Sequence, residues 1–350
     1  MFATETLELA DNMEKIVECF KSHPVAFPTE TVYGLGAIVW REDLIKRVFE
    51  VKNRPNDNPL IVHVSSLEML RECIDGDIPK EYKEVIELFW PGPLTLLFKR
   101  SKKIPDAVTA GGEYVAIRMP NHRDTLKLID HLQAPIVGPS ANKSTRPSPT
   151  TAKHVFEDLN GEIPVIIDGG ACEKGVESTV VNGLLSPPLL LRHGSITYEE
   201  LQEYFAGLAL LSEMTQHEKQ TCPGTRYKHY SPTAPVIMFT GTDSEKQAKI
   251  TVYLEQQAKA VQNGRISKVG LLLPSGLLQA IEQNVGAANP SLNLVGYPLG
   301  ESLTEIAHSI FDGLRYLDRY TETIYTADVE NRQEGRAVMD RLTRASSTIV

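Results

Sequence analysis

The sequence lacks the cysteine and histidine clusters that hold metal ions or cross-link small domains. Its four cysteines lie far apart and form no Cys-x-x-Cys pair, and its nine histidines show no His-Glu-x-x-His spacing. Structural zinc sites and disulfide frameworks need ligands or partners at characteristic short spacings. We therefore expect neither a metal held by protein ligands nor a fold stabilised by disulfides.

Long hydrophobic runs are also missing. Apolar stretches such as Leu94–Phe98 are no longer than a strand, whereas a membrane span needs roughly 20 apolar residues. The first residues, Met1–Asp11, are acidic and lack the basic segment and apolar core of a secretory signal. We expect no membrane association and a cytoplasmic location.

An excess of positive charge is missing as well. The chain has 36 Lys and Arg against 45 Asp and Glu, a formal net charge of −9, and residues 1–208 alone carry 22 against 30. Proteins that coat nucleic acids depend on many contacts between phosphates and Lys or Arg. The composition argues against that class and leaves open only a small basic groove with weak RNA binding.

The length of 350 residues suggests about two domains. The segment Ser212–Pro235 is polar, contains Pro223, Gly224 and Pro232, and is typical of a linker. We expect a first domain over residues 1–208, a linker over 209–234 that serves as a lid, and a second domain over 235–350.

Short strands and helices succeed one another irregularly in the first domain. Strands are expected over Val25–Phe27, Leu60–Val64, Leu94–Phe98, Tyr114–Arg118, Ile136–Val137, Val165–Ile167, Thr179–Val181 and Leu189–Arg192. Helices are expected over Asp11–Lys21, Glu42–Val51, Lys80–Phe89, Arg123–His131 and Thr151–Leu159. Several strands in succession predict a mixed α/β sheet rather than a regular doubly wound one.

The second domain alternates more regularly. Strands are expected over Val236–Thr240, Val269–Leu273, Leu292–Tyr297 and Thr323–Ala327, with helices around Glu245–Asn263, Leu277–Gln283 and Thr304–Tyr320 between them. This order predicts a small parallel sheet covered by helices. The domain has neither Gly-x-Gly-x-x-Gly nor a P-loop sequence, so its fold alone does not make it a nucleotide binder.

Hydroxyl groups and glycines follow the first expected strand in the run Phe27–Gly36. Such a turn can place Thr29 and Thr31 at the edge of a pocket while Gly34 and Gly36 let the backbone approach closely. A tight turn capped by threonine side chains explains the same residues equally well. Both interpretations stay open on this segment alone.

Two cations and two prolines mark the next motif, Lys52–His63. Lys52 and Arg54 on a stiff loop suit a polyanion such as a triphosphate, although cations also favour helix C-termini for electrostatic reasons. His63 ends a strand and is either a ligand-binding group or a core histidine.

Further polar groups lie where strands end. Ser140 and Asn142 follow the strand at Ile136–Val137, and in α/β proteins such strand ends line ligand crevices. The other candidates are Arg118, Ser178 and Arg192 at strand termini, and Tyr227 among interleaved aromatic and basic residues of the linker.

Together these motifs resemble one known family, the YrdC-type threonylcarbamoyl-AMP synthases in their long, two-domain form. The matching sequences are Pro28-Thr-Glu-Thr-Val-Tyr-Gly-Leu-Gly36, Lys52-x-Arg54 with Ser140-x-Asn142, Trp90-Pro-Gly-Pro-Leu-Thr95, Val115-Ala-Ile-Arg-Met-Pro120 and Gly175-Val-Glu-Ser-Thr179. The resemblance spans nearly the whole chain and is most specific up to Gly194.

The resemblance implies a fold and a reaction. The fold would be a YrdC-like twisted mixed sheet with an open concave groove, followed by a smaller C-terminal Rossmann-like α/β domain. The reaction would be a nucleotidyl transfer in which L-threonine, bicarbonate or CO2, and ATP give threonylcarbamoyl-AMP and pyrophosphate. The product would pass to the tRNA threonylcarbamoyl transferase machinery that makes t6A at tRNA position 37.

The resemblance also implies roles for individual residues. Those expected to contact ATP are Lys52, Arg54, Asn58, the Tyr114 backbone, Ser140, Asn142, Ser148, Arg192 and Tyr227. Those expected to hold threonine are Thr29 or Thr31, His63, Arg118 and Ser178, with Arg118 as the partner of its carboxylate. Mg²⁺ would accompany ATP, held mainly by phosphate oxygens and water.

Two other classes stay open at this point. One is a noncatalytic RNA-binding module that uses the same groove, which the acidic first domain disfavours. The other is carbamoyl transfer by a maturation enzyme that contains a related domain. Such enzymes carry zinc-finger and acylphosphatase segments, and this chain has neither Cys-x-x-Cys pairs nor spare length.

Overall fold

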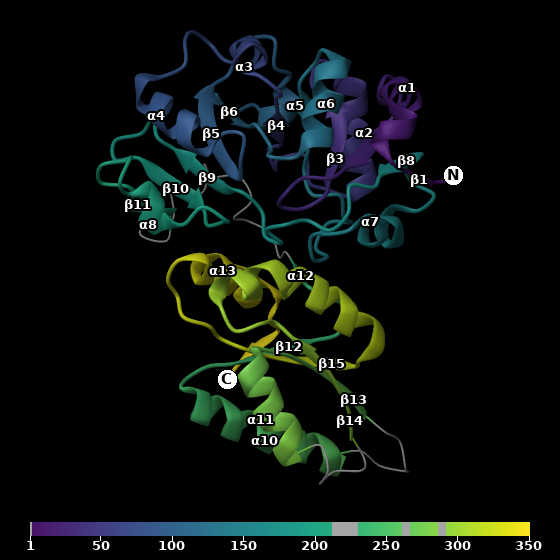
Figure 1. Cartoon of the computed structure of the whole chain (residues 1–350), viewed down its shortest axis with the longest axis vertical. Helices are drawn as coiled ribbons and strands as arrows, with labels where there is room; N and C mark the ends of the chain where they lie inside the picture. Colours follow the sequence, from purple (N-terminus) through teal and green to yellow (C-terminus); the bar gives the residue numbers. More distant parts are fainter. Residues whose placement is uncertain (1, 212–229, 261–266, 286–291) are drawn as a thin grey trace. The chain divides into compact units, whose positions relative to one another are not determined.

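The chain forms two compact units in the computed structural model, which describes residues 2–211, 230–260, 267–285 and 292–350 (Figure 1). The first unit comprises Met1–Ser144 and Ser148–Tyr227. The second comprises Thr145–Pro147 and Lys228–Val350. The three residues that interrupt the first unit in the sequence thus belong to the second unit. No helix within the described part of the chain is long and apolar enough to cross a membrane.

An eleven-stranded mixed sheet forms the centre of the first unit, in the order β1-β8-β2-β3-β7-β4-β6-β5-β9-β10-β11. Its strands are β1 Glu5–Leu7, β2 Val25–Phe27, β3 Gly34–Ile38, β4 Ile61–His63, β5 Leu94–Lys99, β6 Tyr114–Arg118, β7 Ile136–Val137, β8 Val165–Ile167, β9 Thr179–Asn182, β10 Leu189–Arg192 and β11 Ala209–Leu210. Parallel pairs such as β4–β6 alternate with antiparallel pairs such as β5–β6. The predicted mixed α/β sheet is therefore confirmed.

Short helices surround this sheet. They are α1 Leu9–Phe20, α2 Glu42–Lys52, α3 Leu67–Cys73, α4 Lys80–Phe89, α5 Asp106–Thr109, α6 Arg123–Leu132, α7 Ala152–Leu159 and α8 Tyr198–Leu201. Side-chain caps begin three of them: Ser66 accepts from the Met69 amide, Thr151 from the His154 amide and Thr197 from the Glu200 amide. Such caps typically contribute about 1 kcal/mol. Helices α1 and α6 pack with β2 and β8 around one apolar cluster (Figure 1).

Strand β3 is the clearest difference from the sequence-based prediction, which placed a turn there. Its sequence, Gly-Leu-Gly-Ala-Ile, contains few residues with high β propensity. A Cβ at Gly34 would lie 2.6 Å from the Phe27 ring, and one at Gly36 would lie 2.8 Å from the Phe20 ring. The two glycines therefore let β3 pass directly over buried aromatic rings. Tertiary packing, rather than local β propensity, makes this segment a strand.

The second unit contains a five-stranded parallel sheet in the order β14-β13-β15-β12-β16. Its elements are β12 Val236–Phe239, α10 Asp243–Ala260, β13 Ser267–Leu273, α11 Ser275–Val285, β14 Leu292–Pro298, α12 Leu303–Tyr320, β15 Thr323–Ala327, α13 Glu334–Ala345 and β16 Thr348–Ile349. Helices α12 and α13 lie on one face and α10 and α11 on the other (Figure 1). The predicted parallel sheet is confirmed. The structure adds two elements that were not predicted, helix α13 and the edge strand β16.

Helix α12 holds the three residues that group with the second unit. Arg315, which is buried, donates from Nε to the Pro147 carbonyl at 3.1 Å and from Nη2 to the same oxygen at 2.5 Å. Arg146 Nη2 lies 3.5 Å from Asp318 Oδ2, and the Ser231 amide donates to the Thr145 carbonyl at 2.7 Å. The stretch Thr145–Pro147 is thus fixed by partners more than 80 residues later in the chain.

Gly194 supports the segment that carries Ser178. An added Cβ would lie 2.3 Å from the Glu177 carbonyl oxygen and 2.4 Å from backbone atoms of Ser178 and Thr179. Because backbone rather than a flexible side chain must move, we expect Gly194→Ala to lower the free energy of unfolding by about 1–3 kcal/mol. Urea unfolding followed by circular dichroism measures this change.

Gly276→Ala is the matched control, because the nearest atoms to its added Cβ lie 3.5 Å away. We expect this variant to stay within about 0.5 kcal/mol of the parent protein. Equal stability of the two variants would contradict the close approach at Gly194.

Candidate functional site

A tight turn follows β2 and presents two threonine side chains. Thr29 Oγ1 donates to the Val32 carbonyl at 2.6 Å and accepts from the amides of Thr31 and Val32, each at 3.2 Å. It also lies 2.9 Å from Thr31 Oγ1. Both hydroxyls are buried. The structure therefore shows a turn capped by threonine side chains. The same turn places the Thr31 hydroxyl beside Arg118.

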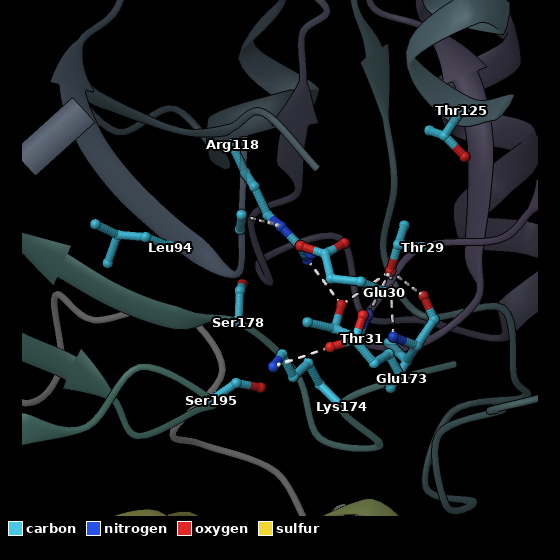
Figure 2. A network of polar contacts seen from close by, with 12 residues as sticks. Thr29, Glu30, Thr31, Leu94, Arg118, Thr125, Glu173, Lys174, Ser178 and Ser195 are labelled. Atoms are coloured by element: carbon cyan, nitrogen blue, oxygen red, sulfur yellow. Dashed lines mark hydrogen bonds and ion pairs between the residues drawn. The ribbon is translucent and has the colours of Figure 1, made fainter. Parts of the chain in front are cut away.

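A buried ion pair lies beside this turn. Arg118, at the end of β6, places Nη2 2.6 Å from Glu30 Oε2, and the two side chains are only 4% and 3% exposed. Arg118 Nη1 donates to Thr31 Oγ1 at 2.8 Å, and its Nε donates to the Gly92 carbonyl at 3.1 Å. Figure 2 shows the Arg118 side chain reaching toward Glu30 and Thr31.

Ser178 is linked to a second arginine. Its hydroxyl lies 2.7 Å from Thr95 Oγ1 and accepts from Arg192 Nη2 at 3.1 Å, while Arg192 Nε donates to the Ser178 carbonyl at 3.0 Å. The neighbouring residue, Glu177, accepts a hydrogen bond of 2.6 Å from Ser148. Hydrogen bonds thus connect Thr95 on β5, Ser178 just before β9 and Arg192 on β10. Ser148 joins them through Glu177, the residue before Ser178.

Lys52 forms hydrogen bonds with the backbone of the Ser140–Asn142 segment. Its ammonium is buried at the end of α2 and donates to the carbonyl oxygens of Ser140 and Asn142, the latter at 2.6 Å. The Ser144 amide returns a hydrogen bond of 2.8 Å to the Lys52 carbonyl. The family resemblance paired these two motifs, and in the structure Lys52 contacts the Ser140–Asn142 segment through backbone carbonyls.

Arg54 closes the loop that follows α2. Asn53 ends the helix in the left-handed conformation, with φ of 50°. Arg54 then donates from Nε to the Asn58 carbonyl at 3.2 Å and from Nη2 to the Pro59 carbonyl at 3.0 Å. Asn58 is buried, and its Oδ1 has no hydrogen-bond partner within the described part of the chain. The loop is therefore shaped by the arginine that was predicted to bind phosphate.

His63 is buried on β4, directly beside Arg118 in the register of β4 and β6. Its ring packs edge-on against Phe27 with centroids 5.5 Å apart, and its Nδ1 has no hydrogen-bond partner among the residues described. Burial, followed by the charge of Arg118, lowers the pKa of His63 to about 3. The imidazole is consequently neutral at physiological pH.

The remaining two residues expected to contact ATP are Tyr114 and Tyr227. Tyr114 begins β6 while Arg118 ends it, which separates them by about 13 Å along the strand. Tyr114 lines a cavity of about 390 Å³ together with Asp75, Asp77 and Lys99. Tyr227, with most of the expected linker, lies outside the described residues, so its role and the lid remain predictions.

Three further residues of the site, Glu30, Thr95 and Glu177, lie within the sequence motifs but were not predicted to have a role. Glu30 could have been identified from the sequence, because it is the only charged residue in the run Phe27–Gly36. A lone acidic residue between two threonines next to a buried strand indicates that a cation or hydrogen-bond donor lies close by.

The described site contains hydroxyls, cations and two carboxylates but no activated nucleophile. Cys172 lies close to the Thr29–Thr31 turn, and burial raises the pKa of its thiol well above the usual range. Its thiol is therefore protonated and unreactive at neutral pH. Within the described residues, no group of three or more His, Cys, Asp or Glu side chains could hold a metal ion. The arrangement suits orientation and charge stabilisation rather than covalent catalysis.

Family comparisons match both parts of the chain. Residues 20–194 match the family described as "Telomere recombination", and residues 196–347 match the family described as "Threonylcarbamoyl-AMP synthase, C-terminal domain". Relatives named threonylcarbamoyl-AMP synthase include one from Schizosaccharomyces pombe, 39% identical over 99% of this chain and 90% of its own length. Another, from Bacillus subtilis, is 38% identical over 99% of this chain and 96% of its own length.

Solved structures agree with the sequence comparisons. The crystal structure of Pyrococcus abyssi Sua5 complexed with L-threonine is 36% identical and matches with a TM-score of 0.84. The match covers 100% of this chain and 99% of that one. The family resemblance predicted from the motifs is confirmed.

The lowered pKa of His63 predicts a specific pH dependence of stability. In the unfolded chain this histidine takes up a proton near pH 6.5, whereas in the folded chain it does so only near pH 3. Between these values the unfolded state binds more protons, so acid destabilises the fold. From pH 6.5 to 4.5 the protein should lose about 2–3 kcal/mol of unfolding free energy more than His63→Gln.

Urea unfolding of both proteins at the two pH values measures this difference, because other titrating groups contribute equally to each. Identical pH dependence in the parent and His63→Gln would show that the folded protein protonates this ring as readily as the unfolded chain.

Proposed function

The chain belongs to the threonylcarbamoyl-AMP synthase family, and we propose that it condenses L-threonine, CO2 or bicarbonate, and ATP into threonylcarbamoyl-AMP and pyrophosphate. The observation that carries the proposal is the buried cluster of Arg118, Glu30 and Thr31, within a chain similar over its full length to a structure with L-threonine bound.

The chemistry needs no nucleophile from the protein. The amine of threonine captures CO2 as a carbamate, whose oxygen attacks the α-phosphorus in line while pyrophosphate leaves. The protein then acts by holding the reactants together and stabilising developing negative charge, which are the largest contributions in many enzymes. A site with cations, hydroxyls and an inert Cys172 thiol suits this nucleotidyl transfer.

The threonine side of the site is assigned to the groups around β6. Arg118 binds the carboxylate, because arginine matches carboxylate geometry with paired donors. Thr29 or Thr31 and Ser178 supply hydroxyls, and neutral His63 supplies a ring nitrogen for the substrate hydroxyl. Neutrality matters, since a second full cation beside Arg118 would be strongly repelled.

The ATP side is assigned to the loop after α2 and to the segments that it contacts. The residues are Lys52, Arg54, Asn58, Ser140, Asn142, Ser148 and Arg192, together with the Tyr114 backbone and Tyr227. ATP enters as its magnesium complex, in which phosphate oxygens and water hold the ion. The product passes to a tRNA threonylcarbamoyl transferase in the cytoplasm.

Mass spectrometry of the products tests the reaction directly. The full chain is incubated with ATP, Mg²⁺, L-threonine and ¹³C-labelled bicarbonate, and pyrophosphate is measured in parallel. We expect a labelled threonylcarbamoyl-adenylate and pyrophosphate release that requires both threonine and bicarbonate. Release that does not require threonine would refute the proposed function.

Arg54→Ala tests the assignment of the ATP side. A charge-assisted hydrogen bond is worth about 1.5–3 kcal/mol, so kcat/KM for ATP should fall roughly 10- to 150-fold. Arg54→Lys should recover only part of this loss, because a lysine cannot bridge the Asn58 and Pro59 carbonyls as the guanidinium does.

Arg71→Ala is the control, since Arg71 is half exposed and pairs only loosely with Glu68 at 3.6 Å. Steady-state pyrophosphate release by the three variants measures the effect. Near-normal ATP use by folded Arg54→Ala would remove this residue from the ATP site.

A further inference from the structure

The ion pair between Glu30 and Arg118 has unused hydrogen-bonding capacity. Within the described part of the chain, neither Glu30 carboxylate oxygen has a hydrogen-bond partner, and neither does Arg118 Nη2, although Nη2 and Oε2 are 2.6 Å apart. The two groups attract as charges without an aligned hydrogen bond. Both are almost completely buried.

Such an arrangement is unfavourable unless something else completes it. Buried polar atoms in native proteins nearly always have partners, and a buried charge without hydrogen bonds loses much of its hydration energy. A direct pair of two buried ions often fails to repay that loss. The incomplete hydrogen bonding therefore points to a ligand that supplies both a donor and an acceptor.

The two residues differ in how firmly they are fixed. Arg118 is fixed independently of Glu30, by the Thr31 hydroxyl and the Gly92 carbonyl. The Glu30 backbone is fixed by the Lys174 amide, which donates to the Glu30 carbonyl at 2.7 Å, but its carboxylate is held by charge alone. The carboxylate can therefore exchange Arg118 for another cation without disrupting the turn.

We propose that Glu30 binds the α-ammonium group of the amino-acid substrate while Arg118 binds its carboxylate. The zwitterion replaces one poorly aligned ion pair by two charge-assisted contacts, and net charge in the site is unchanged. The proposal rests on the proposed function and adds to it a residue that recognises the amine. It concerns binding alone, so no bond forms or breaks.

The reaction changes the charge on the substrate nitrogen, and this change determines which species Glu30 binds better. An ammonium group is attracted to Glu30, whereas the nitrogen of a carbamate carries no positive charge and its new carboxylate is repelled. Glu30 therefore favours the unreacted amino acid over a carbamate at the same place. The same preference excludes N-acylated amino acids and acids without an amine.

A comparison of two ligands separates this role from a merely structural one. Binding of L-threonine is compared, by calorimetry on the full chain, with binding of the hydroxy acid in which a hydroxyl replaces the α-amino group. In Glu30→Gln we expect threonine to bind about 10- to 150-fold more weakly. Binding of the hydroxy acid should change by only about twofold, because it has no ammonium to lose.

Parallel weakening of both ligands would overturn the proposal, since it would show that Glu30 only orients Arg118. Unchanged threonine binding would overturn it too. Glu173→Gln is the control, because that carboxylate lies on the neighbouring loop, is 71% exposed and pairs with Lys174. It should bind both ligands as the parent protein does.

Two further measurements test the role of Glu30 if Glu30→Gln does not fold. Glu30→Asp retains the charge and should still prefer threonine over the hydroxy acid. The parent protein itself must show that preference, and equal affinity for the two ligands would overturn the proposal without any variant. Calorimetry does not depend on turnover, so a parent protein that shows the preference but forms no adenylate would refute only the proposed function.

Discussion

The buried positive charge of Arg118 is the constraint around which the first unit is organised. A guanidinium cannot lose its proton at any physiological pH, so the fold must supply acceptors wherever it places one. Here two segments provide its partners: the turn after β2 supplies the Thr31 hydroxyl as an acceptor and the Glu30 carboxylate as a counter-charge, and the loop before β5 supplies the Gly92 carbonyl. Burial, followed by the charge of Arg118, keeps the neighbouring His63 neutral. Arg118 thus affects both the protonation and the hydrogen bonding of the residues around the end of β6.

Cations elsewhere in this unit shape the backbone before they meet any ligand. Lys52 donates to two carbonyls of the Ser140–Asn142 segment, and Arg54 to two carbonyls of its own loop. Arg192 holds both the carbonyl and the hydroxyl of Ser178. Such contacts fix the direction of the donors that remain, and donors fixed in advance stabilise charge without reorganising during a reaction. The side chains that look like ligand-binding groups therefore also maintain the geometry of the site.

Sequence alone predicted the apolar strands and the kinds of residue in the site, but not their partners. Strands β6 and β10 were placed with their correct bounds because each is a nearly continuous apolar run ended by an arginine. Strand β3 was missed because its two glycines are explained only by the aromatic rings beneath them. Glu30 shows the same limit. Which side chain meets Arg118, and which end of β6 faces the hydroxyls, depend on strand order and register across the sheet.

The anchoring of Thr145–Pro147 has a consequence for synthesis of the chain on the ribosome. Arg315, which holds the Pro147 carbonyl, is translated 168 residues after it. At the usual rate of about 5–20 residues per second, this interval lasts roughly 10–30 s. All strands of the first sheet have left the ribosome by then, while these three residues still wait for helix α12. The nascent protein thus passes through a stage in which its N-terminal sheet can be complete and one of its loops remains unanchored.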